Sequence, residues 1–232
     1  MNKDIGIIVT FYNHKNYIYQ CLENLRNLKL QYPQINIYVI NSGSTDFSFN
    51  EYRNFTKTFQ NLNIIRTENL GSSGSKNYGA ELATDPIITF LDGDDLFDQK
   101  RILIGAKMIF SNEFDLVIGN QKYIFESDVD LSKIDKSKIS DENPLRTYLN
   151  SMILKKDTFF KVGLFDTNYK IAGDLDWFLR AKRKKVKIAI THEDFVMRRI
   201  RVDNLSFSYQ QSFKERNLIL LKHHQEISKL ND

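Results

Sequence analysis

Residues 87–95 read Ile-Ile-Thr-Phe-Leu-Asp-Gly-Asp-Asp, an apolar run that ends in three carboxylates. The run is rich in β-branched side chains and bounded by Pro86 and Gly93, which predicts a buried strand of a parallel sheet. Ligands of open α/β sheets bind just beyond the carboxyl ends of such strands. The acids therefore indicate one of two features. They form either an oxygen-ligand site for Mg²⁺ or Mn²⁺ with a phosphate-bearing substrate, or a solvated turn that caps the next helix.

Composition and charge narrow the class of protein. The chain has 232 residues, of which 41% are hydrophobic, enough for one large domain, or a domain plus a small appendage, with a substantial core. The formal net charge of +4 suits an anionic substrate or membrane surface and does not call for nucleic acid. The single cysteine, Cys21, excludes an internal disulfide, and no run reaches the length of about 18 apolar residues that spans a membrane. The amino terminus lacks a signal-peptide layout, so we expect a cytoplasmic protein, with the inner membrane face as an alternative setting.

Strands and helices alternate along the first half of the chain. Apolar runs predict strands at residues 5–10, 35–40, 63–66, 87–91 and 115–120. Amphipathic segments between them predict helices, and two of these should bury apolar faces made of Tyr17, Ile18, Cys21, Leu22, Leu25 and Leu28, and of Ile102, Leu103, Ala106 and Ile109 or Phe110. This alternation is typical of an α/β fold with a doubly wound, mostly parallel central sheet flanked by helices.

The pattern changes after about residue 121. Residues 126–142 are polar, without periodicity, and predict a long mobile loop. Further strands are expected at 151–155, 186–190 and 195–201, and helices at 157–162, 174–184 and 209–230, the last burying Phe213, Leu220, Leu221 and Ile227. We therefore divide the chain into a nucleotide-binding part (1–121), an acceptor-side part (122–208) and a terminal helix (209–232).

Four polar clusters follow predicted strand ends. They are Thr10–Asn13, Asn41–Asp46, Asn69–Asn77 and Asp92–Asp95, and a parallel sheet brings all four to one edge. In the third cluster, glycines permit close backbone approach and Lys76 at a helix start can meet a phosphate. A flexible linker would have the same composition, and the ending of a P-loop is missing.

The second half offers one acid and a group of arginines. Asp174 stands where a helix begins, so it is either a helix cap or a chemical group. Arg180 can pair with an acid or a phosphate, or can be solvated. Arg199 and Arg201, together with Arg198, interleave with a predicted strand and form either an anion site or a solvated face. The four histidines have no metal-ligand spacing.

Five motifs in this order resemble the family 2 glycosyltransferases of the GT-A fold over nearly the whole chain. The matching stretches are a strand with Tyr-Asn (Ile7–Asn13), a polar turn (Val39–Asp46), Asn69-x-Gly71 with Lys76-Asn77-x-Gly79, the Asp-x-Asp motif (Leu91–Asp95), and Val162–Asp166 followed by Gly173-Asp174 and Arg180. The resemblance implies that Thr10 and Tyr12 line the nucleobase pocket. It also implies that the Asn41-Ser42 turn faces the base, with Asp46 supporting it.

The resemblance also implies roles for the charged residues. Lys76 would lie near the diphosphate, Asp92 and Asp94 would hold the ribose and the metal, and Asp95 would be an alternative or additional metal ligand. Asp174 would be the general base. Arg180 and Arg201 by this resemblance, and Arg199 by its place in the arginine cluster, are candidate substrate-binding residues.

Three positions depart from the family pattern. Ser42 stands where the family often has an aspartate that reads uracil, so the identity of the base is open. Lys76 replaces the usual loop arginine with a point charge. Arg201 replaces a histidine often found in the last motif, so the metal or diphosphate contact of that histidine is in question.

The resemblance implies an inverting hexosyltransferase. It would move a sugar from a nucleoside-diphosphate sugar, a UDP-sugar being favoured, to a hydroxyl of a glycan or lipid-linked acceptor, with Mn²⁺ or Mg²⁺ and in polysaccharide biosynthesis. A sugar-phosphate nucleotidyltransferase is one alternative, tested by pyrophosphate release. A non-catalytic GT-A-like binding domain is the other, tested by metal-dependent hydrolysis of a nucleotide sugar. The terminal helix suits either a homodimer or peripheral membrane contact.

Overall fold

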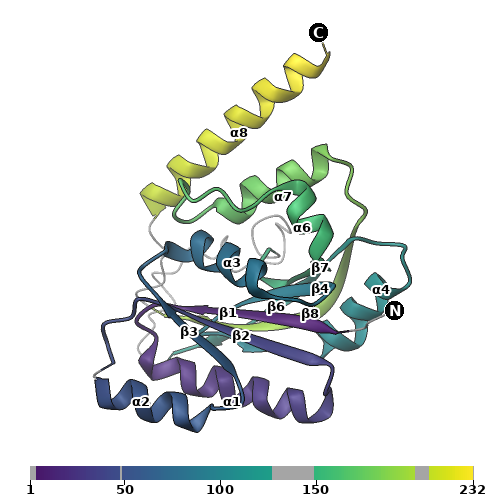
Figure 1. Ribbon diagram of the computed structural model, residues 1–232. Helices are drawn as coiled ribbons and strands as arrows, with labels where there is room; N and C mark the ends of the chain where they lie inside the picture. The colour runs from purple at the N-terminus through teal and green to yellow at the C-terminus, as the bar shows by residue number, and fades with distance from the viewer. Residues whose placement is uncertain (1–3, 48, 127–148, 202–208, 232) are drawn as a thin grey trace.

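The computed structural model describes residues 4–47, 49–126, 149–201 and 209–231 (Figure 1). Within these residues, one eight-stranded sheet has the order β3-β2-β1-β4-β7-β6-β8-β5. The strands are β1 (Ile5–Phe11), β2 (Ile35–Ser42), β3 (Asn63–Thr67), β4 (Ile87–Asp92), β5 (Leu96–Phe97), β6 (Leu116–Phe125), β7 (Met152–Lys155) and β8 (Ile188–Ile200).

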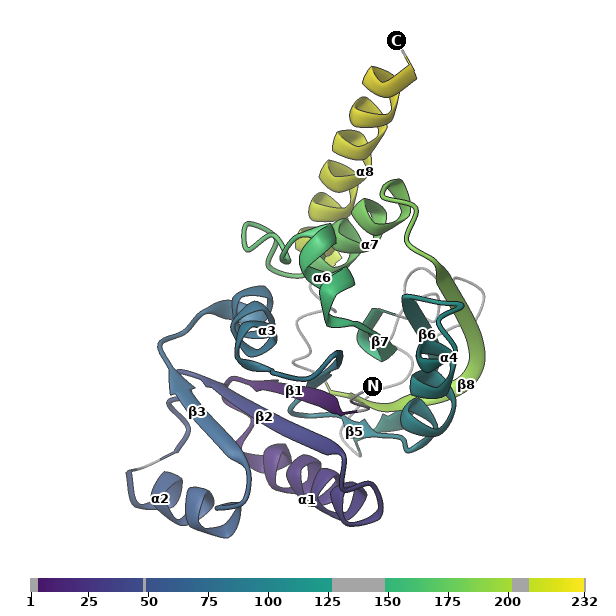
Figure 2. The same cartoon turned by 45° about the vertical axis from the view of Figure 1, so that its right-hand side comes forward.

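Helices cover both faces of this sheet. The helices of the described residues are α1 (Lys15–Gln31), α2 (Phe49–Thr58), α3 (Gly71–Leu82), the π-helix η1 (Arg101–Ala106) continued by α4 (Lys107–Phe110), the short 3-10 turn η4 (Leu149–Ser151), α6 (Lys156–Val162), α7 (Gly173–Arg183) and α8 (Tyr209–Asn231). Helices α1 and α2 lie on one face, and α3, α6 and α7 lie on the other (Figures 1 and 2). In the described part of the chain, no helix is long and apolar enough to cross a membrane.

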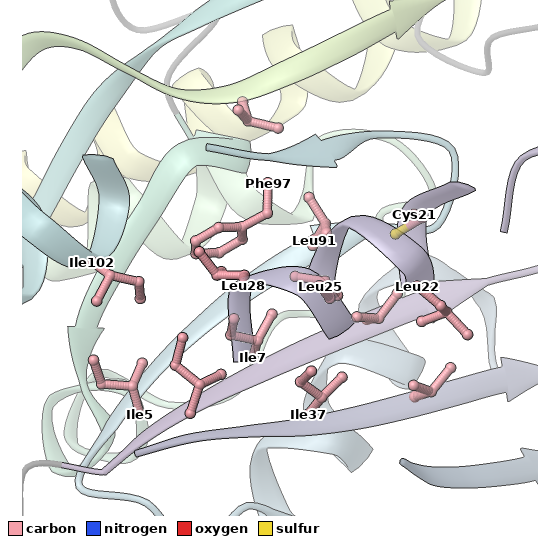
Figure 3. Packing of buried hydrophobic residues seen from close by; sticks show 14 of the residues in the cluster. Ile5, Ile7, Cys21, Leu22, Leu25, Leu28, Ile37, Leu91, Phe97 and Ile102 are labelled. Carbon is pink, nitrogen blue, oxygen red and sulfur yellow. The ribbon is translucent and has the colours of Figure 1, made fainter. Parts of the chain in front are cut away.

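The two faces of the sheet carry two separate apolar cores. Ile5 and Ile7 of β1 pack with Leu22 and Leu25 of α1 in the first core (Figure 3). Ile8, next to Ile7 in sequence, belongs to the second core beneath α3, α6 and α7. Successive side chains of a strand point to opposite faces, so a strand covered on both faces reads as an unbroken apolar run.

The pairing of the strands confirms the predicted mostly parallel sheet. Strand β1 runs parallel to β2 and β4, and β2 runs parallel to β3. Strand β7 is antiparallel to both β4 and β6, whereas β6 and β8 are parallel. The register opposes Thr10 to Ile40 on one side and to Asp92 on the other. The polar segments after β1, β2 and β4 therefore share one edge of the sheet.

Two local predictions were wrong. The strands expected at 186–190 and 195–201 are one strand, β8, because β6 pairs along both stretches and absorbs register shifts near Asn120. Leu103, expected to face inward, is exposed, while Ile102, Ala106 and Ile109 are buried as predicted. The first part of that helix is a π-helix, whose wider turn moves side chains off the face predicted for an α-helix.

The buried face of α8 also differs from the prediction. Phe213, Leu220 and Leu221 are exposed, and the side chain of Ile227 lies outside the described part. Glu215, Ile219 and His223 are buried instead, since α8 contacts α7 and the segment before it through polar groups. Its far end projects away from the other elements (Figures 1 and 2).

Two further predictions stay predictions. Nearly all of the predicted loop at 126–142 lies outside the described residues. The division near residue 121 stays a prediction about function. Structurally, β6 runs across that point and pairs with β7 and β8 in the same sheet.

Candidate active site

The turns after β1 and β2 interlock at the shared edge. Asn13, with a left-handed φ of 54°, donates its backbone N–H to Ser44 Oγ at 3.0 Å, and its Oδ1 accepts from Thr45 N at 2.8 Å. Asp46 Oδ2 accepts the backbone N–H of Lys15 at 2.7 Å, which caps the start of α1. This arrangement leaves Thr10 buried and Tyr12 exposed beside the turn.

The residues predicted to face a base are buried in the second turn. Asn41 Oδ1 accepts the Ser44 N–H at 2.9 Å, and Ser42 Oγ accepts the Leu70 N–H at 2.9 Å. Gly43 between them has a φ of +73°, and a Cβ there would lie 2.8 Å from Asn69 N. Glycine is needed for both reasons, and the serine hydroxyl ties the second turn to the third.

Helix α3 brings Lys76 to the acids. Lys76 Nζ lies 2.9 Å from Asp92 Oδ1. Burial alone would lower the pKa of Lys76, but the Asp92 carboxylate outweighs it and raises that pKa, so the ammonium stays charged. One residue on, Asn77 exchanges two 2.9 Å hydrogen bonds with the backbone of Phe165. The same short motif therefore supplies a cation and binds the segment that follows α6.

Each of the three predicted metal ligands has its own donor. Asp92 pairs with Lys76, Asp94 Oδ2 lies 2.8 Å from Arg201 Nη2, and Asp95 Oδ1 accepts the Arg199 N–H at 2.8 Å. Burial acts to raise the pKa of Asp92, yet Lys76 holds that pKa below its ordinary value. Burial, then the charges of Asp94 and Asp92, raise the pKa of Asp95 well above its ordinary value. Of Asp92 and Asp95, the second is thus the harder to ionise.

Two of the three predicted arginines, Arg199 and Arg201, lie in this cluster. Arg199 is buried and donates from Nε to the Asp94 carbonyl at 3.0 Å and from Nη2 to Gln20 Oε1 at 2.6 Å; its Nη1 pairs with Glu126. The guanidinium of Arg201 stands 4.8 Å from the centre of the Tyr17 ring, and that of Arg199 stands 5.1 Å from it. An aromatic platform therefore carries two cations beside Asp94.

Two residues in or behind the cluster were missed from the sequence. His14 Nδ1 lies 3.8 Å from Asp94 Oδ1, and its Nε2 lies 3.4 Å from Arg201. Its position directly after the first strand was the available signal. Arg101 is fully buried behind β4 and donates to Thr89 Oγ1 and to the carbonyls of Phe90 and Phe195. Burial lowers the pKa of Arg101 to about 9.

Asp174 stands at the start of α7, next to α3. A Cβ on Gly173 would lie 2.5 Å from Ser73 Oγ, so glycine allows the two helices to approach. Asp174 Oδ1 accepts the N–H of Leu175 at 2.8 Å. Burial raises the pKa of Asp174 above its ordinary value; Lys76 opposes that rise and Asp92 adds to it. The carboxylate is therefore in electrostatic reach of the Lys76–Asp92 pair.

The guanidinium of Arg180 is hydrogen-bonded to other groups of the protein. Its Nε donates to Asp176 Oδ2 at 2.8 Å, and its Nη1 and Nη2 donate to the carbonyls of Val162, Gly163 and Leu164 at 3.0, 3.2 and 2.7 Å. These bonds tie α7 to the turn after α6. Its predicted contact with substrate stays a prediction.

The acids fit a divalent cation held jointly with a substrate. Among the described residues, no group of three or more His, Cys, Asp or Glu side chains is placed to hold a metal ion. Mg²⁺ beside phosphates usually takes only one or two carboxylates, with phosphate and water completing its shell. Asp92 and Asp94 can supply those carboxylates. In the described structure, the buried Nδ1 of His14 also has no hydrogen-bond partner beside Asp94.

The model of glycosyl transferase family 2 matches residues 6–170, and the chain belongs to this family. It is 26% identical to the glycosyltransferase AglE of Haloferax volcanii over 198 residues, which are 82% of this chain and 64% of AglE. It is also 26% identical to a poly(ribitol-phosphate) beta-glucosyltransferase of Bacillus spizizenii over 219 residues, which are 88% of this chain and 34% of that protein.

Solved structures confirm the GT-A fold. S. aureus TarS in complex with UDP-GlcNAc superposes with a TM-score of 0.70 at 18% identity, covering 88% of this chain and 61% of TarS. The mannosyltransferase PcManGT of Pyrobaculum calidifontis, in complex with GDP-Man and Mn²⁺, gives 0.68 at 16% identity, covering 97% and 64%. The chain thus spans less than two thirds of the length of these relatives.

Proposed function

We propose that this protein is an inverting glycosyltransferase that uses a nucleoside-diphosphate sugar, with a UDP-sugar favoured. The acceptor would be a hydroxyl of a glycan or of a lipid-linked glycan. One observation carries the proposal: Asp174, with its pKa raised by burial, stands within electrostatic reach of the Lys76–Asp92 pair. Sugar transfer to a hydroxyl requires a carboxylate that can act as a base and, near it, a group that binds the diphosphate.

Asp174 is the proposed general base. A carboxylate whose pKa is raised is a stronger base than an ordinary one, so it better accepts the proton of the attacking hydroxyl. Attack by that oxygen breaks the bond between the sugar and the diphosphate. A single displacement, with one base opposite the leaving group, inverts the anomeric carbon. The bond from Leu175 N–H to Asp174 Oδ1 fixes one oxygen of the carboxylate.

Cationic side chains are proposed to hold the leaving diphosphate. Lys76 and Arg201 already neutralise Asp92 and Asp94, so a phosphate arriving there meets donors that are held in position. Mn²⁺ or Mg²⁺ on Asp92 and Asp94 would supply further charge neutralisation for the diphosphate. Tyr12 and Thr10, with Asn41 and Ser42 across the two turns, are the proposed surroundings of the base.

The structural neighbours support a nucleotide-sugar donor. TarS was solved in complex with UDP-GlcNAc, and PcManGT was solved in complex with GDP-Man and Mn²⁺. Ser42 replaces the aspartate often found there, so the identity of the base is open. A thermal-shift screen of UDP-glucose, UDP-GlcNAc and GDP-mannose, each with and without Mn²⁺, identifies the donor. The cytoplasm, with or without contact at the inner membrane face, is the proposed setting.

Replacement of Asp174 tests the chemistry. Asp174→Asn keeps the shape and the bond from Leu175 but removes the base, so turnover should fall by about a thousandfold or more while donor binding stays within about twofold. Asp157→Asn on the exposed face of α6 makes the same chemical change outside the site and should leave both unchanged. Turnover near the wild-type rate in the Asp174 variant would remove Asp174 from the mechanism.

A further inference from the structure

A buried glutamate of α8 binds the segment that leads into Asp174. The side chain of Glu215 accepts three consecutive backbone N–H groups: Lys170 N to Oε1 at 3.1 Å, Ile171 N to Oε2 at 2.9 Å and Ala172 N to Oε2 at 3.0 Å. Gln211, one turn earlier in α8, donates Nε2 to Glu215 Oε1 at 3.2 Å. A carboxylate buried among four donors is a fixed anchor, since removing it leaves those donors without an acceptor.

The anchored segment determines where α7 begins. Ala172 is the residue that precedes α7, and its carbonyl accepts the N–H of Asp176 at 3.2 Å to open the first turn. Asp174 lies two residues beyond the anchored amide of Ala172. A shift of residues 170–172 is therefore passed directly to the Asp174 carboxylate.

Helix α8 also contacts the residues that follow Asp174. His223 Nε2, two turns after Glu215, lies 3.2 Å from the buried Asp176 Oδ1. The charge of Arg216, next to Glu215, acts on Asp174 to lower its pKa, which favours the ionised form. The chain is thus fixed from α8 on both sides of Asp174, before it by Glu215 and after it by His223.

We propose that Glu215 is a positioning residue for Asp174, and that the first half of α8 is part of the acceptor-side site. This inference rests on the proposed function of Asp174 as the base. The exposed apolar side chains of α8, including Leu218 and Leu221, take no part in it. One side of α8 therefore contacts the residues around Asp174, and the exposed side does not.

Two substitutions of Glu215 test the anchor. Glu215→Gln places an amide NH₂ among N–H donors, and Glu215→Asp draws the carboxylate back by one methylene. Amide hydrogen exchange at Lys170, Ile171 and Ala172 should become faster by about tenfold or more in both variants. Leu218→Ala, an exposed change in the same helix, is the matched control and should leave these amides at the wild-type rate.

The kinetic readout separates positioning from folding. With the nucleotide sugar selected by the screen of UDP-glucose, UDP-GlcNAc and GDP-mannose, kcat of the Glu215 variants should fall by about tenfold to a hundredfold, because a misplacement of about 1 Å has that effect. KM for the donor should stay within about twofold. A rise in donor KM at constant kcat, or unchanged exchange at residues 170–172, overturns the proposal.

The outcome for Asp174→Asn distinguishes the two hypotheses. If that variant keeps wild-type turnover, the proposed base is wrong, and with it the positioning role of Glu215, whatever the exchange rates are. If it loses turnover while the Glu215 variants keep theirs, only the positioning role is wrong. Should both Glu215 variants unfold, Gln211→Ala removes one bond to Oε1, and unchanged exchange and kcat there contradict the proposal.

Discussion

Asp94 stands between two basic side chains of different kinds. Arg201 Nη2 lies 2.8 Å from one carboxylate oxygen, and His14 Nδ1 lies 3.8 Å from the other. A half-exposed or ion-paired arginine keeps its charge around neutral pH, and its fork-shaped donor set suits phosphate. If Arg201 stands in place of the histidine expected from the family resemblance, it adds a cation at neutral pH where the diphosphate is proposed to bind.

Replacing Arg201 tests this assignment. Arg201→Ala should weaken binding of UDP, or of GDP if the screen selects it, by about tenfold or more. The variant loses a charge-assisted hydrogen bond to the phosphate and a cation that offsets the three neighbouring acids. Binding of uridine or guanosine, which carry no phosphate, should change by less than about twofold. Titration calorimetry measures both, with Arg53→Ala on the exposed side of α2 as the control. Equal losses for nucleoside and nucleotide would show that Arg201 supports the fold, not the phosphate.

At the scale of elements, α3 depends on a glycine that faces β1. A Cβ on Gly79 would lie 2.3 Å from Ile8 Cγ2, so the helix can sit at its present distance only without a side chain there. Gly79→Ala should lower the free energy of unfolding by about 1–3 kcal/mol through overpacking, and should move Lys76 away from Asp92. Urea unfolding measures the loss, and Ser72→Ala on the exposed side of α3 should stay within about 0.5 kcal/mol of the wild type. A Gly79→Ala protein of wild-type stability would contradict the packing argument.

The elements also show which features a sequence reveals. β1, β4 and α3 were predicted because their apolar periodicity and turn residues are local. His14 and Arg101 were missed because their roles depend on which strands lie side by side. The residues next to them in the sequence do not reveal that pairing. The predicted buried face of α8 was wrong for a related reason. Glu215 and His223 are buried because they bond to segments distant in the sequence, and this orientation of the helix leaves leucines exposed.

The contact between α7 and α8 is expected to weaken in acid. Burial lowers the pKa of His223, and Arg183 adds to this, although Asp176 and Glu226 act to raise it. A folded-state pKa below the unfolded value of about 6.5 means that the stability this group contributes is present above that pH and is lost as pH falls below it. The free energy of unfolding of the wild type should therefore drop more than that of His223→Gln between about pH 7.5 and about pH 5.5. Urea unfolding at both pH values measures these free energies. If they fall by the same amount in the wild type and in His223→Gln, His223 is not the cause.

At the scale of the whole molecule, one sheet joins the proposed nucleotide-binding part to the proposed acceptor-side part. β6 crosses residue 121 and pairs with β7 and β8, and β7 in turn pairs with β4, the strand that leads into the acid cluster. Asn77 of α3 holds Phe165 across the same division. Packing that is shared in this way predicts that the two parts unfold together, whatever their separate functions are.

The single tryptophan makes that prediction measurable. Trp177 is fully buried in α7, in the proposed acceptor-side part, whereas UDP is proposed to bind in the nucleotide-binding part. With UDP and Mn²⁺ at about a hundred times the dissociation constant, binding to the folded state alone adds about 2.7 kcal/mol. In a cooperative molecule, the unfolding midpoint from Trp177 fluorescence should rise as much as the midpoint from circular dichroism. Uridine, without the diphosphate, should raise both less. The opposite result would be a midpoint from Trp177 fluorescence that UDP does not change, together with two unfolding steps in circular dichroism. That result would mean that the division near residue 121 separates two folding units.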